Sequence, residues 1–142
     1  MRQTQSGYVY VLAATCAATG QAEGLIAPRL DTDIVNRFLA QLSRTLASDV
    51  QAVLVWDGAG YHRANDLVCP ENITLLTLPP YSPELNPVEN LWHYLRSHHW
   101  SNRKYETVDD LFDAAEAAWR ATCLNPETIR TVCRAHYVET RK

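Results

Sequence analysis

The sequence predicts an α/β fold in which helices pack on a mixed β-sheet. Apolar, β-prone runs alternate with amphipathic segments in the order β, β, α, β, α, β, and further helices follow. The chain has 142 residues, of which 46% are hydrophobic and 20% are charged, as expected for one globular domain. Neither a repeat nor a linker divides it. We therefore assign residues 1–142 to a single domain.

The first half of the chain predicts a hairpin and a helix. Residues 8–15 form an almost continuous apolar run, which is typical of a buried strand. A turn at 18–21 and a second strand over 22–27 complete the hairpin. Asp31 is a helix-capping residue, and the apolar stripe that follows predicts an amphipathic helix over 33–47.

The second half predicts two more strands and several helices. Residues 52–56 (AVLVW) are wholly apolar, which suits a central parallel strand that is covered on both faces. The Thr107 and Asn125-Pro126 positions are typical starts of helices. The expected elements are a short helix near 62–69, a strand over 73–78, and helices over 86–99, over 107–123 and from 126 onward.

Two carboxylates flank the later strands. Asp57 follows the strand at 52–56, and Glu89 begins a helix after the proline-rich loop that follows 73–78. If these two strands are adjacent and parallel, both loops leave the same edge of the sheet, where ligands bind in α/β folds. The two carboxylates then converge, and such oxygen ligands suit Mg²⁺ or Mn²⁺.

Each carboxylate also has a purely structural interpretation. Asp57 precedes Gly58, and an Asp in that position is often only a turn former. With Asn86 as the N-cap and Pro87 at the first helical position, Glu89 falls where a capping box places its acidic residue. Composition and spacing leave both interpretations open.

The segments WDGAGYH (56–62) and LPPYSPELNPVENLW (78–92) closely resemble the transposases of the IS630 group, bacterial relatives of the Tc1/mariner transposases. The resemblance runs from about residue 7 to about residue 120 and includes the hairpin and the first helix. It implies a ribonuclease H-like fold, a DDE triad of carboxylates, and cleavage and joining of DNA at transposon ends and target sites. The proline-rich string is the specific part, since an Asp-Gly dipeptide is common.

The resemblance implies a role for three residues. Asp57 corresponds to the second catalytic Asp of the family, Glu89 to its final Glu, and His62 to the His that commonly follows the second Asp. Asp57 and Glu89 are therefore the expected ligands of Mg²⁺ or Mn²⁺. His93, four residues after Glu89, is either a further ligand or a structural histidine.

The first Asp of the triad is missing. In the family it lies on the first strand of the sheet, whereas the first acidic residue here is Glu23. We expect a domain that lacks its first strand and is inactive alone, with an upstream transposase fragment or a second copy as partner. The gap in the sheet is expected to be closed by pairing of 8–15 with 52–56, by residues 1–7, or by a second chain.

The expected DNA contacts are local. The net charge of −3 does not indicate a nucleic-acid binder, so contacts must come from a basic patch. Residues 96–104 form a basic and aromatic cluster in which Arg96, Arg103 and Lys104 are expected to bind phosphates. The alternative is a solvated helix end that places cations at its C-terminus.

The remaining alternatives concern function and location. The chain is either a transposase domain, a non-catalytic remnant that binds nucleic acid or dimerises, or a small-molecule-binding α/β domain. The chain has no glycine-rich phosphate loop, which argues against the last of these alternatives. No apolar run has the length of a membrane span, and the four cysteines form no CxxC pair. We expect a cytoplasmic, nucleoid-associated protein with reduced thiols.

Overall fold

A computed structural model describes residues 9–56, 66–79, 86, 88–100 and 107–133. Their contacts group into two compact units. The first unit comprises Met1–Arg29 and Pro87–Lys142, and the second comprises Leu30–Asn86. Both contain helices and strands, so the predicted α/β class is confirmed, while the assignment of all 142 residues to one domain stays a prediction.

A β-hairpin organises the first unit. Strands β1 (Tyr10–Cys16) and β2 (Gln21–Ala27) pair antiparallel, from Tyr10 opposite Ala27 to Cys16 opposite Gln21. Gly20 closes the turn with a φ of 79°, a conformation that L side chains rarely adopt, and its N–H donates to the Cys16 carbonyl at 2.8 Å. The predicted hairpin is confirmed.

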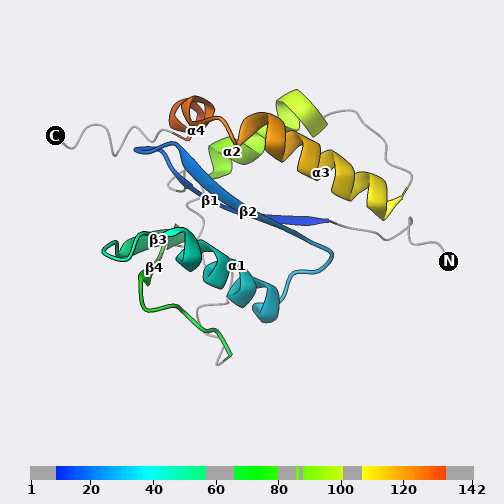
Figure 1. Cartoon of the computed structure of the whole chain (residues 1–142). Coiled ribbons are helices and arrows are strands. Elements are labelled where there is room, and N and C mark those ends of the chain that lie inside the picture. The colour runs from blue at the N-terminus through cyan, green and yellow to red at the C-terminus, as the bar shows by residue number, and fades with distance from the viewer. Residues whose placement is uncertain (1–8, 57–65, 80–85, 87, 101–106, 134–142) are drawn as a thin grey trace. The chain divides into compact units, whose positions relative to one another are not determined.

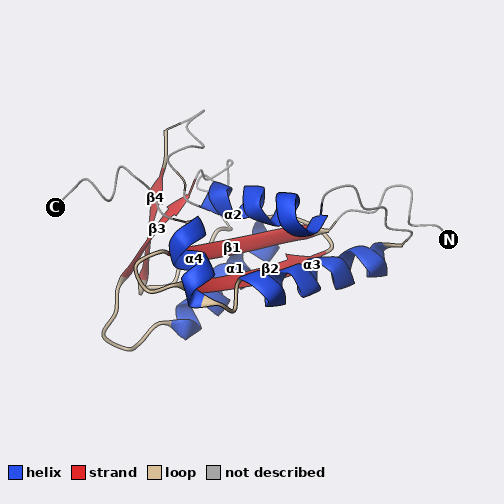
Figure 2. Cartoon of the chain, turned by 90° about the horizontal axis from the view of Figure 1, so that it is seen from above, coloured by secondary structure: helices blue, strands red, loops and turns tan. Residues whose placement is uncertain are grey.

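Three helices lie on one face of this hairpin, as Figures 1 and 2 show: α2 (Val88–Leu95), α3 (Val108–Thr122) and α4 (Pro126–Val132). The starts of α3 and α4 follow the predicted capping residues. The Thr107 hydroxyl accepts a hydrogen bond from the Asp110 N–H at 3.0 Å, and the Asn125 side chain accepts one from the Glu127 N–H at 3.0 Å. A five-residue π-helical turn, η4 (Arg96–Trp100), continues α2.

The core of the first unit lies between the hairpin and these helices. Its buried members are Leu91, Leu95, Ala118, Cys123, Ile129 and Cys133. Trp92 and Trp119 pack against this cluster, in agreement with their apolar positions in the sequence. All four cysteines are free. Burial, with a smaller contribution from Cys133 nearby, raises the pKa of the Cys123 thiol to about 12, so this thiol stays protonated at neutral pH.

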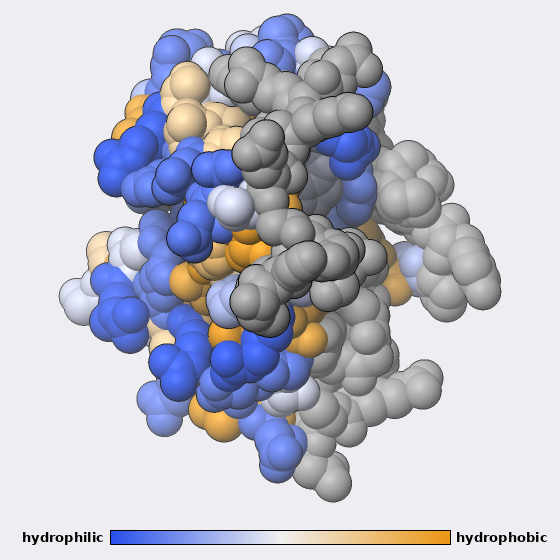
Figure 3. All heavy atoms as spheres, turned by 90° about the vertical axis from the view of Figure 1, so that its right-hand side faces the viewer, coloured by the Kyte–Doolittle hydropathy of each residue, from blue (hydrophilic) through white to orange (hydrophobic). Residues whose placement is uncertain are grey.

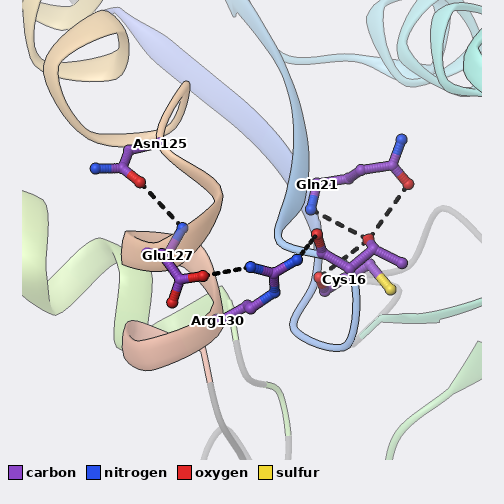
Figure 4. Close-up of polar contacts among 6 residues, drawn as sticks. Cys16, Gln21, Asn125, Glu127 and Arg130 are labelled. Carbon is purple, nitrogen blue, oxygen red and sulfur yellow. Dashed lines mark hydrogen bonds and ion pairs between the residues drawn. The ribbon is translucent and has the colours of Figure 1, made fainter.

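The turn of the hairpin is held against α4 (Figure 4). Arg130 donates one hydrogen bond to the Thr19 carbonyl at 3.1 Å and another to the Glu127 carboxylate. A Cβ added to Gly20 would lie 2.5 Å from the Pro126 carbonyl oxygen, so the turn and the start of α4 are in close contact. This contact joins two segments that lie more than a hundred residues apart.

Gly24 is a point of close approach between the hairpin and α3. A Cβ at this position would lie 2.6 Å from the indole ring of Trp119. We expect Gly24→Ala to destabilise the chain by about 1–3 kcal/mol, because the ring must move out of its packed position. Urea denaturation measures this cost. In a double-mutant cycle, Trp119→Leu should recover part of it, and equal costs in both backgrounds would contradict the contact.

The second unit contains one helix and a parallel pair of strands. Helix α1 (Thr32–Thr45) begins after Asp31, whose carboxylate accepts a hydrogen bond from the Ile34 N–H at 2.9 Å. Strands β3 (Ala52–Trp56) and β4 (Ile73–Thr77) pair parallel, from Ala52 opposite Ile73 to Trp56 opposite Thr77. All three elements agree with the prediction to within a few residues.

The short helix predicted near 62–69 is wrong in its described part, because residues 66–69 form a turn and loop. The Asn36 side chain of α1 explains the difference. Its amide donates to the Asp66 carbonyl at 2.8 Å, and its oxygen accepts from the Val68 N–H at 2.8 Å. A side chain from another element thus takes the backbone groups that a local helix would use. Residues 62–65 lie outside the described part of the chain.

Within the described residues each unit contains one two-stranded sheet, β1–β2 in the first unit and β3–β4 in the second. The expected pairing of 8–15 with 52–56 would join strands of different units, so it stays a prediction. Residues 1–7, the second candidate for the gap, lie outside the described range.

One face of the β3–β4 sheet is apolar and open to solvent. The register places Val53 beside Thr74 and Val55 beside Leu76 on the same face. Val53 is 60% exposed and Leu76 is 53% exposed. Parallel sheets are normally covered on both faces, and two strands alone are only marginally stable. In the view of Figure 3, the described surface is mainly hydrophilic, with smaller hydrophobic areas between the polar ones.

Candidate active site

The two strands that lead into the candidate site end side by side. The Leu78 N–H donates to the Trp56 carbonyl at 2.8 Å, and the Trp56 indole donates to the Thr77 hydroxyl at 3.2 Å. The condition on which the sequence argument depended, an adjacent and parallel pair, is therefore confirmed. The segment that begins with Asp57 and the proline-rich loop both start from this edge of the sheet.

Asp57 and His62 lie outside the described residues. The residues before and after this segment make specific hydrogen bonds within the second unit. Pairing with β4 fixes Trp56 on one side, and the hydrogen bonds of Asn36 fix Asp66 and Val68 on the other. The roles that we assign to the Asp57 carboxylate and the His62 ring stay predictions.

Glu89 lies in the first turn of α2, in the first unit, as the sequence predicts, and its side chain is half-buried. The same helix buries Leu91 and Leu95 completely in the core. A helix anchored in this way holds its first turn in a fixed position relative to the hairpin. The convergence of Glu89 with Asp57 on one metal ion stays a prediction.

The basic cluster is described in part. Arg96 and His93 are exposed, at the end and in the last turn of α2, whereas Arg103 and Lys104 lie outside the described residues. The sequence analysis missed one feature of this segment. The rings of Tyr94 and His98 stack with their centroids 4.0 Å apart and their planes 16° apart. The four-residue spacing of two aromatic rings on a helix was the available signal.

The donor chemistry of the candidate ligands fits a hard divalent cation. Asp57 and Glu89 supply carboxylate oxygens, which Mg²⁺ and Mn²⁺ prefer to thiol or imidazole ligands. Within the described part of the chain, no group of three or more His, Cys, Asp or Glu side chains is placed to hold a metal. Asp57, one of the two candidate ligands, lies outside that part of the chain.

Comparison with known proteins gives two kinds of match. The profile of the family described as DDE superfamily endonuclease matches residues 2–112. An uncharacterised protein of Sinorhizobium fredii, y4pE/y4sA, is 39% identical over 125 residues, which cover 88% of this chain and 93% of that protein. The Tc3 transposase of Caenorhabditis elegans is 39% identical over 69 residues, which cover 46% of this chain.

The matches differ in how much of each relative they span. The chain extends over nearly the whole length of the Sinorhizobium protein but aligns with only 21% of the Tc3 transposase. No solved structure gives a significant match. None of the helices in the described ranges combines the length and apolar character that a membrane crossing needs.

Proposed function

Because the chain belongs to the DDE superfamily of endonucleases, we propose that it is part of the catalytic domain of a bacterial transposase of the IS630 type. The similarity to the Tc3 transposase supports a relationship to the Tc1/mariner group. The observation that carries the proposal is the parallel β3–β4 pair. The Asp57 segment and the proline-rich loop both begin where these two strands end. This is the edge of the sheet at which α/β folds bind their ligands.

The proposed reaction is phosphoryl transfer on DNA. Asp57 and Glu89 would hold the divalent ion, Mg²⁺ or Mn²⁺, which when bound would lower the pKa of water and stabilise charge on the phosphate. A water molecule, or a DNA 3′-OH in strand joining, attacks phosphorus in line, forms the new P–O bond and loses its proton. The bond to the leaving oxygen breaks, and that oxygen takes up a proton. His62 orients Asp57 or the attacking water.

The proposed catalytic site requires a first Asp that this sequence does not supply. A site with two metal ions needs carboxylates that bridge and flank both ions, and the sequence holds no acidic residue before Glu23 to act as the first Asp. Within the described residues β3 and β4 form a sheet of only two strands, which is consistent with a sheet that lacks a strand. We propose that an upstream polypeptide segment supplies the first Asp and a strand of the sheet; a second copy of the chain could complete the sheet but not supply that Asp.

The test is complementation. The 142-residue chain is mixed with a polypeptide that carries the upstream strand and its Asp, and nicking of supercoiled plasmid is measured with Mg²⁺, with Mn²⁺ and with EDTA. We expect nicking from the mixture, dependent on the metal ion, and little from either part alone. An upstream polypeptide with Asn in place of that Asp is the matched control. Absence of metal-dependent nicking from the mixture would contradict the catalytic proposal.

A second candidate function is a non-catalytic remnant that binds nucleic acid or dimerises. The exposed apolar face of β3–β4 favours it, since a second copy would cover Val53 and Leu76. Light scattering after size-exclusion chromatography measures the oligomeric state. Titration with DNA at several salt concentrations measures the phosphate contacts of Arg96, Arg103 and Lys104. Both candidate functions, in so far as they involve DNA binding, imply that the protein is located at the bacterial nucleoid.

A further inference from the structure

The junction of α2 and η4 presents a fixed aromatic surface. The Tyr94 and His98 rings are nearly parallel, at 4.0 Å between centroids and 16° between planes. The His98 ring is fixed a second time, because its Nδ1 lies 3.1 Å from the Tyr94 carbonyl oxygen and donates a hydrogen bond to it. Ring and backbone contacts together therefore hold the imidazole in one orientation.

His98 is exposed to solvent, and the half-buried Tyr94 covers only one face of its ring. The opposite face is therefore the face left for a ligand. Arg96, two residues before His98, is also exposed and places a cation on the same turn of η4, although not on the same side of the helix. An exposed ring and a cation on one segment form a combination that binds single-stranded nucleic acid.

We propose that the face of His98 opposite Tyr94 binds an unpaired DNA base, which extends the His98–Tyr94 stack, while Arg96 contacts a phosphate of the same DNA. This inference rests on the proposed action of the domain on DNA. Bases inside a duplex are stacked on both faces, so the surface selects single-stranded ends or unpaired flanks. Because the ring is already fixed, little side-chain entropy is lost on binding.

A structural interpretation of the same pair exists. Aromatic pairs four residues apart stabilise helices by a few tenths of a kcal/mol, and this stacking occurs next to a π-helical turn. In that case His98 would affect the stability of the helix and leave DNA binding unchanged. Substitutions that separately change the ring of His98, the charge of this segment and the stability of the helix therefore decide between the two interpretations.

The experiment uses the full 142-residue chain and duplexes that are either blunt or carry a short single-stranded extension with 2-aminopurine. No metal ion is added. We expect tighter binding to the extended duplex and quenching of 2-aminopurine fluorescence as the base stacks. His98→Ala should weaken binding to the extended duplex about tenfold and leave blunt-duplex affinity unchanged.

Two further substitutions separate stacking from charge. His98→Phe keeps a ring and should retain the preference for extended DNA, whereas His98→Lys supplies a cation without a ring and should lose it. Arg96→Ala should weaken binding to both DNAs and reduce the salt dependence by about one unit of slope. Arg120→Ala, which removes an exposed arginine paired with Glu116 on α3, is the control and should change neither affinity.

Loss of the preference in His98→Lys with retention in His98→Phe supports the stacking surface. Equal weakening on blunt and extended DNA, or an unchanged preference in His98→Ala, overturns it. The outcome is independent of the catalytic proposal, because binding without metal requires no completed triad. Failure of plasmid nicking together with a His98-dependent preference would contradict the nuclease and leave the DNA surface in place.

Discussion

Glu89→Gln is expected to lower metal-dependent DNA cleavage by the completed domain by about a thousandfold or more. Glutamine keeps the size and shape of the side chain but replaces the anionic oxygens by a neutral amide, which binds Mg²⁺ and Mn²⁺ poorly. Removing a single group that stabilises transition-state charge already costs about 10²–10³ in rate. Loss of a ligand displaces the ion as well, so the effect should exceed this range.

The same substitution separates catalysis from helix capping. Gln is as suitable as Glu at the capping-box position, so a purely structural Glu89 predicts almost unchanged activity and stability. Glu127→Gln is the matched control, since Glu127 is also acidic in the first turn of a helix of the same unit. It should lose its ion pair with Arg130, lower stability by at most about 1 kcal/mol, and keep full cleavage.

Initial rates of plasmid nicking at several Mg²⁺ and Mn²⁺ concentrations provide the measurement. Glu89→Gln should stay inactive at all of them, while Glu127→Gln should follow the unsubstituted chain. Cleavage by Glu89→Gln within a few fold of that chain would exclude Glu89 as a metal ligand. The half-buried position in the first turn of α2 would then be explained by helix formation alone.

Elements whose signals are local were predictable from the sequence. The capping side chains of Asp31, Thr107 and Asn125 each accept a backbone hydrogen bond two or three residues ahead, so each helix start is determined within one turn. The hairpin closes through the four residues before Gln21, and Gly20 supplies the positive φ. Short-range geometry of this kind is readable from residue type.

Elements that depend on distant partners were not predictable. The loop after residue 65 is set by Asn36, which lies thirty residues earlier on another element. The partners of a strand also depend on long-range pairing, which strand propensity does not determine. The π-helical turn at Arg96–Trp100 follows a regular apolar stripe, and the sequence pattern gave no sign of the change in winding.

The same distinction between local and distant determinants applies to the candidate site. The strands β3 and β4 were predictable from their apolar runs, and their parallel pairing meets the condition set by the sequence argument. The expected cover on both faces was wrong for this sheet, because Val53 is 60% exposed. The position of Glu89 in a first turn was predictable from the prolines before it. The stack of Tyr94 on His98 was not, because it requires the particular rotamers of two side chains and the backbone of η4.

Leu95→Ala is expected to destabilise the chain by about 2–5 kcal/mol, the usual cost of truncating a fully buried leucine. Leu95 is 0% exposed and belongs to the core cluster of the first unit, at the last α-helical position before η4. Leu124→Ala is the control, since Leu124 is 65% exposed in the same unit, and its cost should stay within about 0.5 kcal/mol. Urea denaturation followed by circular dichroism measures both.

The consequence for function follows from the helix that Leu95 anchors. Glu89 begins α2, and Tyr94 and His98 lie on either side of Leu95, so one buried side chain supports both the proposed metal ligand and the proposed base-stacking surface. Leu95→Ala should therefore weaken binding to extended DNA and, in the completed domain, nicking, under conditions where the chain is still folded. Similar costs for Leu95→Ala and Leu124→Ala would show that α2 is not held by this core, and the rigid placement of Glu89 and His98 would lose its physical basis.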